Sequence, residues 1–216
     1  AYEQGRPNAV ELLKDYLDVY PASRHADEVN FLIGSAHFGQ GEYQKAIFWF
    51  NESNIDMLSP EQQEVYCFRL AYSLLQIGDM EKARGYFARI EQIGTKYREA
   101  STYYVAYIDY ATGKYNNALV EFTRLKDLPD YKERSLYYIT QIYFIQNKYE
   151  KVISEGKELL ASYPDSENNS EVYRIMGNAY YHLGNEDQAI NMLSKYVSST
   201  DSPLRGCLLY TSDAAD

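Results

Sequence analysis

Apolar residues recur along the chain with the spacing of helices, and charged residues interrupt each apolar run. Between the helical stretches, one short pattern recurs in which a glycine or asparagine is followed five residues later by alanine or valine. Its five copies span residues 41–46, 78–83, 113–118, 147–152 and 184–189, so their last residues are 37, 35, 34 and 37 apart. A period this regular, with helices between the copies, predicts an array of helical hairpins.

Turn and cap residues agree with these hairpins. Four of the five copies begin with glycine, at the place where one helix has to end and the chain turn, and this place often requires positive φ. Ser59, Pro60 and Glu61 predict the start of a helix. A serine hydroxyl can cap the helix, proline has no N–H to leave unpaired there, and a carboxylate faces the positive end of the helix dipole.

Two further features of the period match a known repeat. The first helix of each copy carries a large apolar residue followed by a small one, at 33–34, 70–71, 105–106, 139–140 and 176–177. Four residues after the closing alanine, the second helix carries Phe50, Phe87, Phe122 or Leu193. The pattern resembles the tetratricopeptide repeat, a unit of two antiparallel helices. The resemblance implies an all-α fold, a right-handed α-solenoid of tetratricopeptide helical hairpins.

The register makes residues 1–206 a single solenoid. It comprises a half repeat at 1–26 and repeats at about 27–63, 64–98, 99–132, 133–169 and 170–206. Ala9, Leu13, Tyr16 and Pro21 match a second helix and its closing proline, so we expect a fragment of a longer array. Residues 207–216 do not continue the pattern, and we expect them to be a foreign tail such as a cloning or sequence-processing scar.

The fourth copy departs from the pattern at two places. It has Gly156 where a large side chain should pack, and Val152 where alanine would let the two helices approach each other. The sequence therefore predicts a looser hairpin in this repeat.

Peptide ligands of the tetratricopeptide family usually lie along the first helices, on the concave side of the stack. Positions five, nine and twelve of these helices are mostly aromatic here, and tyrosine is in excess, with 24 residues against 8 phenylalanines. The resemblance therefore implies a partner-binding groove lined by Phe31, Phe68, Tyr72, Tyr103, Tyr107, Tyr110, Tyr137, Gln141, Arg174 and Asn178. The alternative is that these rings pack against neighbouring repeats. The excess of tyrosine favours a partly wet surface, because a buried phenol has to find a hydrogen-bond partner.

The charge and composition of the chain exclude several classes of partner and of chemistry. A net charge of -10 disfavours nucleic acid, whose binding needs Lys and Arg to replace released counterions. No apolar run approaches the roughly 18 residues of a membrane span, so we expect no direct membrane insertion of this segment. His25, His37 and His182 lie far apart in a solenoid, and Cys67 has no histidine near it. We therefore expect no catalytic residues, no metal, no cofactor and no enzymatic activity.

These observations favour a non-enzymatic protein–protein interaction scaffold that binds a protein or an extended peptide, apolar or proline-rich, in the aromatic groove. Chaperone-binding members of the family hold a C-terminal carboxylate with lysine at position five and asparagine at position nine. Only Arg174 and Asn178 resemble that pair, so we do not expect a heat-shock-protein adaptor. The alternative is a passive spacer in a larger protein whose activity lies in flanking domains. Self-association through the solenoid ends is a third possibility.

Two links between repeats bear on the cellular compartment. Residues 20–23 and 163–166 both read Tyr-Pro-x-Ser. These links are similar to those of bacterial cell-envelope tetratricopeptide proteins, such as the outer-membrane assembly lipoprotein and the Tol-Pal accessory factor. The resemblance favours the bacterial periplasm or cell envelope, with the cytoplasm as the alternative because cytoplasmic arrays carry the same link.

Overall fold

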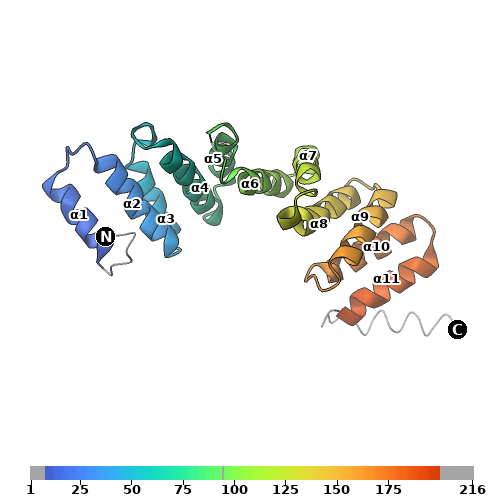
Figure 1. The fold of residues 1–216 in the computed structure, drawn as a ribbon. Coiled ribbons are helices and arrows are strands. Elements are labelled where there is room, and N and C mark those ends of the chain that lie inside the picture. Colours follow the sequence, from blue (N-terminus) through green and yellow to red (C-terminus); the bar gives the residue numbers. More distant parts are fainter. Residues whose placement is uncertain (1–7, 94, 200–216) are drawn as a thin grey trace. The chain divides into compact units, whose positions relative to one another are not determined.

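The computed structural model describes residues 8–93 and 95–199. Within these ranges the chain forms eleven α-helices and one 3-10 helix and contains no strand, so the all-α prediction is confirmed (Figure 1). The helices are α1 (Ala9–Val19), α2 (Ala26–Gly39), α3 (Tyr43–Asn51), a 3-10 helix (Ile55–Met57), α4 (Pro60–Gln76), α5 (Met80–Ile93), α6 (Arg98–Ala111), α7 (Tyr115–Leu125), α8 (Pro129–Ile145), α9 (Tyr149–Ser162), α10 (Asn169–His182) and α11 (Glu186–Ser199). Residues 207–216, where we predicted a foreign tail, lie outside the described ranges.

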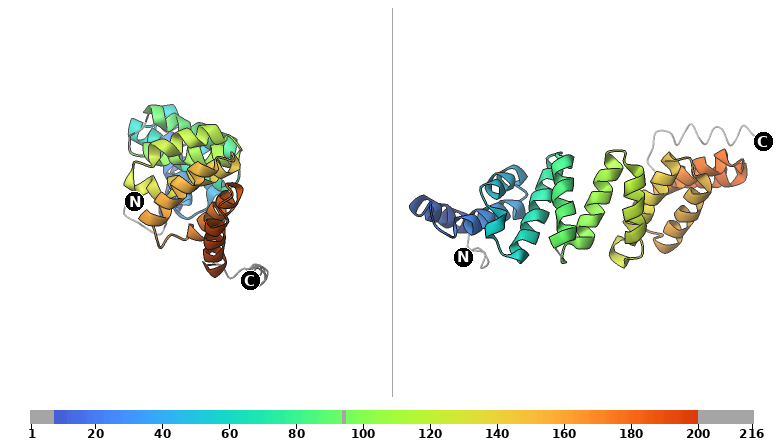
Figure 2. Two further views of the ribbon diagram at one scale, coloured as in Figure 1. Left: turned by 90° about the vertical axis from the view of Figure 1, so that its right-hand side faces the viewer. Right: turned by 90° about the horizontal axis from the view of Figure 1, so that it is seen from above.

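The chain divides into two compact units, Ala1–Ile108 (unit 1) and Asp109–Asp216 (unit 2), and each is described by itself. In unit 1, α2 packs against α3 and α4 against α5, and α3 also contacts α4. In unit 2, α8 packs against α9 and α10 against α11, and α9 also contacts α10 (Figure 2). The pairs α2/α3, α4/α5, α8/α9 and α10/α11 are helical hairpins, and within each unit the two hairpins pack on each other. The predicted repeat boundaries within residues 1–206 stay a prediction.

The five turns inside the hairpins share one backbone conformation. Positive φ occurs at Gly41 (73°), Gly78 (86°), Gly113 (78°), Gly184 (73°) and Asn147 (56°). In each turn, the N–H of the next residue donates to the carbonyl five residues before it, over 2.7–3.0 Å. These bonds satisfy carbonyls at the helix end that would otherwise lack a partner. The prediction of left-handed turn residues is confirmed, and asparagine serves in the fourth turn because it tolerates this region better than most residues.

The predicted helix start at Ser59 is also confirmed. Helix α4 begins at Pro60, and the Ser59 Oγ accepts a hydrogen bond from the Gln62 N–H over 3.3 Å. In return, the Ser59 N–H donates to the Gln62 Oε1 over 3.0 Å. This reciprocal capping box satisfies two N–H groups at the end of α4.

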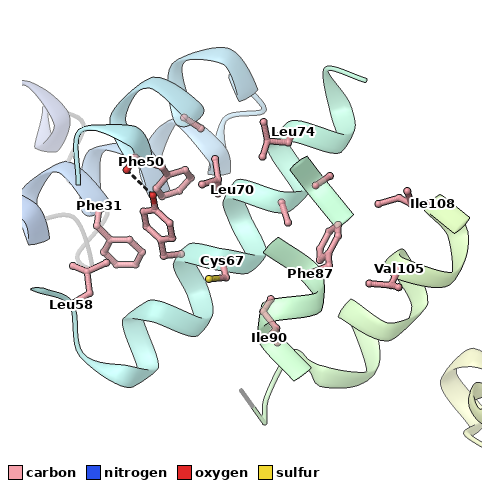
Figure 3. Packing of buried hydrophobic residues seen from close by; sticks show 14 residues of the cluster. Phe31, Phe50, Leu58, Cys67, Leu70, Leu74, Phe87, Ile90, Val105 and Ile108 are labelled. Carbon is pink, nitrogen blue, oxygen red and sulfur yellow. Dashed lines mark hydrogen bonds between the residues drawn. The ribbon is translucent and has the colours of Figure 1, made fainter. Parts of the chain in front are cut away.

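Unit 1 fills its core with aromatic rings placed beside small residues. Phe50 on α3 and Phe87 on α5 are fully buried, and the Tyr66 hydroxyl donates to the Phe50 carbonyl over 2.9 Å (Figure 3). A Cβ atom on Gly34 would lie 2.8 Å from the Phe50 Cδ1, which is closer than packing allows. Because Gly34 has no side chain, the Phe50 ring can pack directly against α2 inside the hairpin α2/α3.

The fourth repeat is not loose at the position that we expected. A Cβ atom on Gly156 of α9 would lie 2.6 Å from the Sδ of Met176, a fully buried residue on α10. Val152 is also fully buried. Our expectation of a looser hairpin is wrong here because Met176, a side chain from the next hairpin, occupies the volume that Gly156 leaves.

The two Tyr-Pro-x-Ser links have the same local structure. Tyr20 has φ of -130° and ψ of 62°, and Tyr163 has φ of -135° and ψ of 66°. In both links, the serine hydroxyl accepts from the N–H two residues later, over 3.2 Å. Each link thus ends one second helix and leads into the next first helix, α1 into α2 and α9 into α10.

Candidate functional site

The predicted partner-binding residues fall into two groups, one in each unit. Phe31, Phe68, Tyr72, Tyr103 and Tyr107 belong to unit 1. The residues in unit 2 are Tyr110, Tyr137, Gln141, Arg174 and Asn178. All ten lie on the first helices of hairpins or on α6, and nine of them are half-buried.

Phe31 differs from the other nine because it lies in the core of unit 1. Its side chain exposes only 5% of its surface, and its ring centroid lies 6.2 Å from that of Phe50. Figure 3 shows it beside Leu58, another buried residue of the same cluster. For Phe31 the structure supports the packing alternative, and we leave this residue out of the surface described next.

The unit 1 aromatic surface consists of half-buried rings in edge or stacked contact, which are Phe38, Phe68, Tyr72, Tyr97, Tyr103 and Tyr104. Tyr104 connects them, with its centroid 5.5 Å from Tyr103, 5.6 Å from Tyr72 and 6.2 Å from Phe68. Tyr104 is in turn stacked on the buried Phe87, at 4.9 Å. Ring contacts of this geometry add to the stabilisation from burial, so the rings are held in fixed positions.

Two further contacts define the edges of the unit 1 aromatic surface. Phe68 is stacked on Tyr97 at 4.5 Å, and the Tyr97 N–H donates to the buried carboxylate of Glu64 over 2.7 Å. The Arg69 guanidinium lies 5.7 Å from the centroid of Phe38, a cation–π distance. The surface therefore combines apolar ring faces with charged and hydroxyl groups at its margin.

In unit 2, the predicted residues and Glu171 form two hydrogen-bonded groups, Tyr110 with Gln141, and Arg174 with Glu171 and Asn178. The charges of Glu171 and Arg174 also act on Tyr137, and these six residues are here called the unit 2 polar face. The Tyr110 hydroxyl donates to the Gln141 Oε1 over 2.8 Å. Burial raises the pKa of Tyr137 and the charge of Glu171 adds to the rise, while a hydrogen bond with Gln141 opposes it. Tyr137 is therefore a neutral phenol at physiological pH.

Arg174 and Asn178 are also partnered on the unit 2 polar face. The Arg174 Nε and Nη2 donate to the two carboxylate oxygens of Glu171 over 2.8 and 2.6 Å. This hydrogen-bonded carboxylate raises the pKa of Arg174. The Asn178 Nδ2 donates to the Arg174 carbonyl over 2.9 Å. Both side chains of the pair that resembled a carboxylate clamp are therefore already hydrogen-bonded within α10.

The sequence reasoning missed two rings that organise these surfaces. Tyr104 stacks on Phe87 in unit 1, and Tyr138 stacks on Phe122 in unit 2 at 4.9 Å with ring planes 9° apart. They lie 34 residues apart, at the same position of consecutive repeats. The signal was thus present in the repeat register, one residue after Tyr103 and Tyr137.

Other candidate chemistry is sparse in the part of the chain that the structure describes. Residues 8–93 and 95–199 contain no group of three or more His, Cys, Asp or Glu side chains placed to hold a metal ion. Burial raises the pKa of the Cys67 thiol to about 11, which keeps it protonated and inert. None of the helices in these ranges has the length and apolar character of a membrane span. Open cavities of 330–680 Å³ are lined by residues outside the predicted set.

Comparison with known sequences detects the repeat directly. Models of the tetratricopeptide repeat match residues 27–53, 66–92 and 171–199, together less than half of the chain. These segments cover most of the hairpins α2/α3, α4/α5 and α10/α11. No curated protein sequence matches the chain.

Comparison with solved structures shows the fold. The crystal structure of YrrB, described as a TPR protein with an unusual peptide-binding site, is similar with a TM-score of 0.71 at 12% identity, over 95% of this chain and 100% of that one. A crystal structure of MamA protein is similar with a TM-score of 0.66 at 16% identity, over 81% of this chain and 92% of that one. At these identities the similarity establishes an all-α tetratricopeptide solenoid and nothing about ligands.

Proposed function

We propose that this chain of tetratricopeptide repeats is a protein-interaction scaffold that binds an extended segment of another polypeptide on its half-buried aromatic residues. The observation that carries the proposal is the unit 1 aromatic surface, where stacking and edge contacts hold six partly exposed rings in place. Solenoids of this class generally bind proteins or peptides. The peptide-binding site of YrrB, which has the same fold, supports the same use here.

Energetics favour such a surface for binding. Aromatic side chains lose little conformational entropy on binding, and rings that are already packed against neighbours lose still less. Tyr72 touches the rings of Phe38, Tyr43 and Tyr104, so a partner meets a preorganised ring. A ligand rich in proline or other apolar residues fits this chemistry, because extended proline-rich segments dock on aromatic-lined surfaces.

The test is selection of peptides from a random displayed library on the full chain, followed by calorimetric titration of the selected peptides. We expect Tyr72→Ala in unit 1 or Tyr137→Ala in unit 2 to weaken binding about tenfold or more, as truncation of a binding anchor does. Matched controls are Phe48→Ala on α3 and Ile190→Ala on α11, which truncate side chains that are more than half exposed on second helices. Thermal unfolding of each variant establishes that it is folded.

The competing function is a passive spacer between domains of a larger protein. It predicts that the library yields no binder, or that all four variants bind the selected peptides equally well. Self-association through the ends of the solenoid predicts instead a particle size that grows with concentration, which sedimentation of the same samples measures.

A cell-envelope type of tetratricopeptide protein is the finer part of the proposal. It is supported by the two Tyr-Pro-x-Ser links, whose backbone angles and serine hydrogen bonds agree closely. Fractionation of source cells into periplasm and cytoplasm, with detection by an antibody, tests this assignment.

A further inference from the structure

Arg174 on α10 already holds a carboxylate. Its Nε and Nη2 donate to both oxygens of Glu171 at 2.8 and 2.6 Å, and both side chains stay about one-third exposed. Two parallel N–H···O bonds are the strong geometry by which arginine recognises a carboxylate. Glu171 therefore lies where the carboxylate of a ligand would have to bind.

Apart from the Arg174–Glu171 pair, whose opposite charges offset each other, the groups that remain for a ligand on the unit 2 polar face are uncharged. The Asn178 Nδ2 is used by the Arg174 carbonyl, and no described residue donates a hydrogen bond to the Asn178 Oδ1. The Gln141 Oε1 accepts a hydrogen bond from the Tyr110 hydroxyl. The neutral phenol of Tyr137 can donate to a backbone C=O, and the Asn178 Oδ1 can accept from a backbone N–H. Every internal peptide unit provides both groups.

We propose that the unit 2 polar face binds an internal segment of a polypeptide rather than its C-terminal end, and that Glu171 is the residue that determines this preference. The inference rests on the proposed function of the same face. A terminal carboxylate would have to displace Glu171 from Arg174 or lie beside it, and two carboxylates at one guanidinium repel each other. An internal peptide unit carries no carboxylate, so it neither displaces Glu171 nor is repelled by it.

The test uses Glu171→Gln and a pair of probes that differ only at one end, N-acetyl-Tyr-Phe as the free acid and as the C-terminal amide. Binding is followed by NMR through the Arg174 Nε–H resonance and the amide resonances of α8 and α10. For the wild-type chain we expect the amide to bind at least as tightly as the acid. For Glu171→Gln we expect the acid to gain about tenfold over the amide and to shift the Arg174 resonance.

Two further variants control this experiment. Glu150→Gln makes the same substitution in the first turn of α9, and it should leave the ratio of acid to amide affinity unchanged. The double variant Glu171→Gln with Arg174→Gln should lose the gain, because the fork that would bind the acid is removed. Thermal unfolding of all variants establishes that they are folded.

The outcomes separate the inference from the proposed function. If both probes bind and the acid is already preferred by the wild-type chain, or gains nothing in Glu171→Gln, the role of Glu171 is overturned while binding at this face stands. If neither probe shifts resonances of α8 or α10 in any variant, the inference and the binding function of the unit 2 polar face are both overturned.

Discussion

The hairpins α2/α3 in unit 1 and α8/α9 in unit 2 fill the same place of the repeat in opposite ways. In α2/α3, the first helix carries Gly34 and the second helix fills the space with Phe50. In α8/α9, the first helix carries the buried Thr140 and the second helix carries Gly156. The space is filled there by Met176, from the next hairpin.

This difference shows that both hairpins keep the same volume filled, although the side chain that fills it comes from a different position in each. Phe50 fills a gap inside its own hairpin, because Gly34 lies on the preceding helix α2, and its ring also contacts Tyr66 on α4 at 5.3 Å. Met176 instead joins two hairpins, since the glycine that admits it lies on α9 and the methionine on α10. Loss of Phe50 should therefore weaken its own hairpin most, whereas loss of Met176 should weaken two hairpins to a similar extent.

The largest expected effects come from truncating these two side chains. Phe50→Ala should cost about 3–5 kcal/mol and Met176→Ala about 2–5 kcal/mol of local stability, the usual range for fully buried residues. Native-state hydrogen exchange measures the loss helix by helix. We expect Phe50→Ala to reduce protection most in α2 and α3, with a smaller loss in α4, and Met176→Ala to reduce it in α9 and α10 alike. Equal loss throughout either unit would contradict the contrast between local and shared packing.

Substituting alanine for Gly34 or Gly156 tests the same contrast between the two hairpins with a smaller expected effect. Gly34→Ala forces a Cβ to 2.8 Å from the rigid Phe50 ring, and overpacking of this kind costs about 1–3 kcal/mol. Gly156→Ala forces a Cβ to 2.6 Å from the Met176 Sδ, but methionine is flexible and can move aside. Both glycines lie inside helices, so the gain of about 1 kcal/mol in helix propensity applies to both substitutions and does not separate them. We therefore expect Gly156→Ala to cost at least 1 kcal/mol less than Gly34→Ala in urea unfolding. A larger loss for Gly156→Ala would show that Met176 has no room to move.

The sequence predicted those features that depend on neighbouring residues of the chain. The left-handed turns and the cap at Ser59 follow from local backbone chemistry, and the repeat register gave Gly34 and Phe50 their positions on the two helices, although not the contact between them. The role of Met176 could not be predicted, because a pattern of single repeats does not say which side chain of another hairpin enters a gap. Phe31 shows the same limit at the candidate site, since it has the register position of the half-buried Phe68 but is covered by its neighbours.

The partnering of Arg174 was within reach of the sequence. Glu171 precedes it by three residues, a spacing that places both side chains on one face of a helix. The register alone presented Arg174 as a group available to a ligand. The helix surface formed by positions three and four residues apart, unlike the repeat register, indicates that Glu171 is the carboxylate that binds Arg174.

The smallest expected effect concerns the turns of the same two hairpins. Glu42 follows the α2/α3 turn, where Lys148 occupies the equivalent place after the α8/α9 turn. Hydrogen bonds from Lys45 and then His37 lower the pKa of Glu42 below its ordinary 4.5, and the His37 Nδ1 lies 2.6 Å from its carboxylate. A lowered folded-state pKa means that this stabilisation is complete above pH 4.5 and is lost as the pH falls through the lower value.

We expect Glu42→Gln to reduce protection of α2 and α3 slightly at pH 7 and to make no difference once the carboxylate of the wild-type chain is protonated. Because the Glu42 side chain is 36% exposed, water screens its ion pairs, and the loss should be a small fraction of that caused by Phe50→Ala. Hydrogen exchange at several pH values measures it, with α8 and α9 as the internal reference because their turn carries Lys148. A variant that differs from wild type equally at pH 7 and at pH 2 would show that the Glu42 charge does not stabilise this turn.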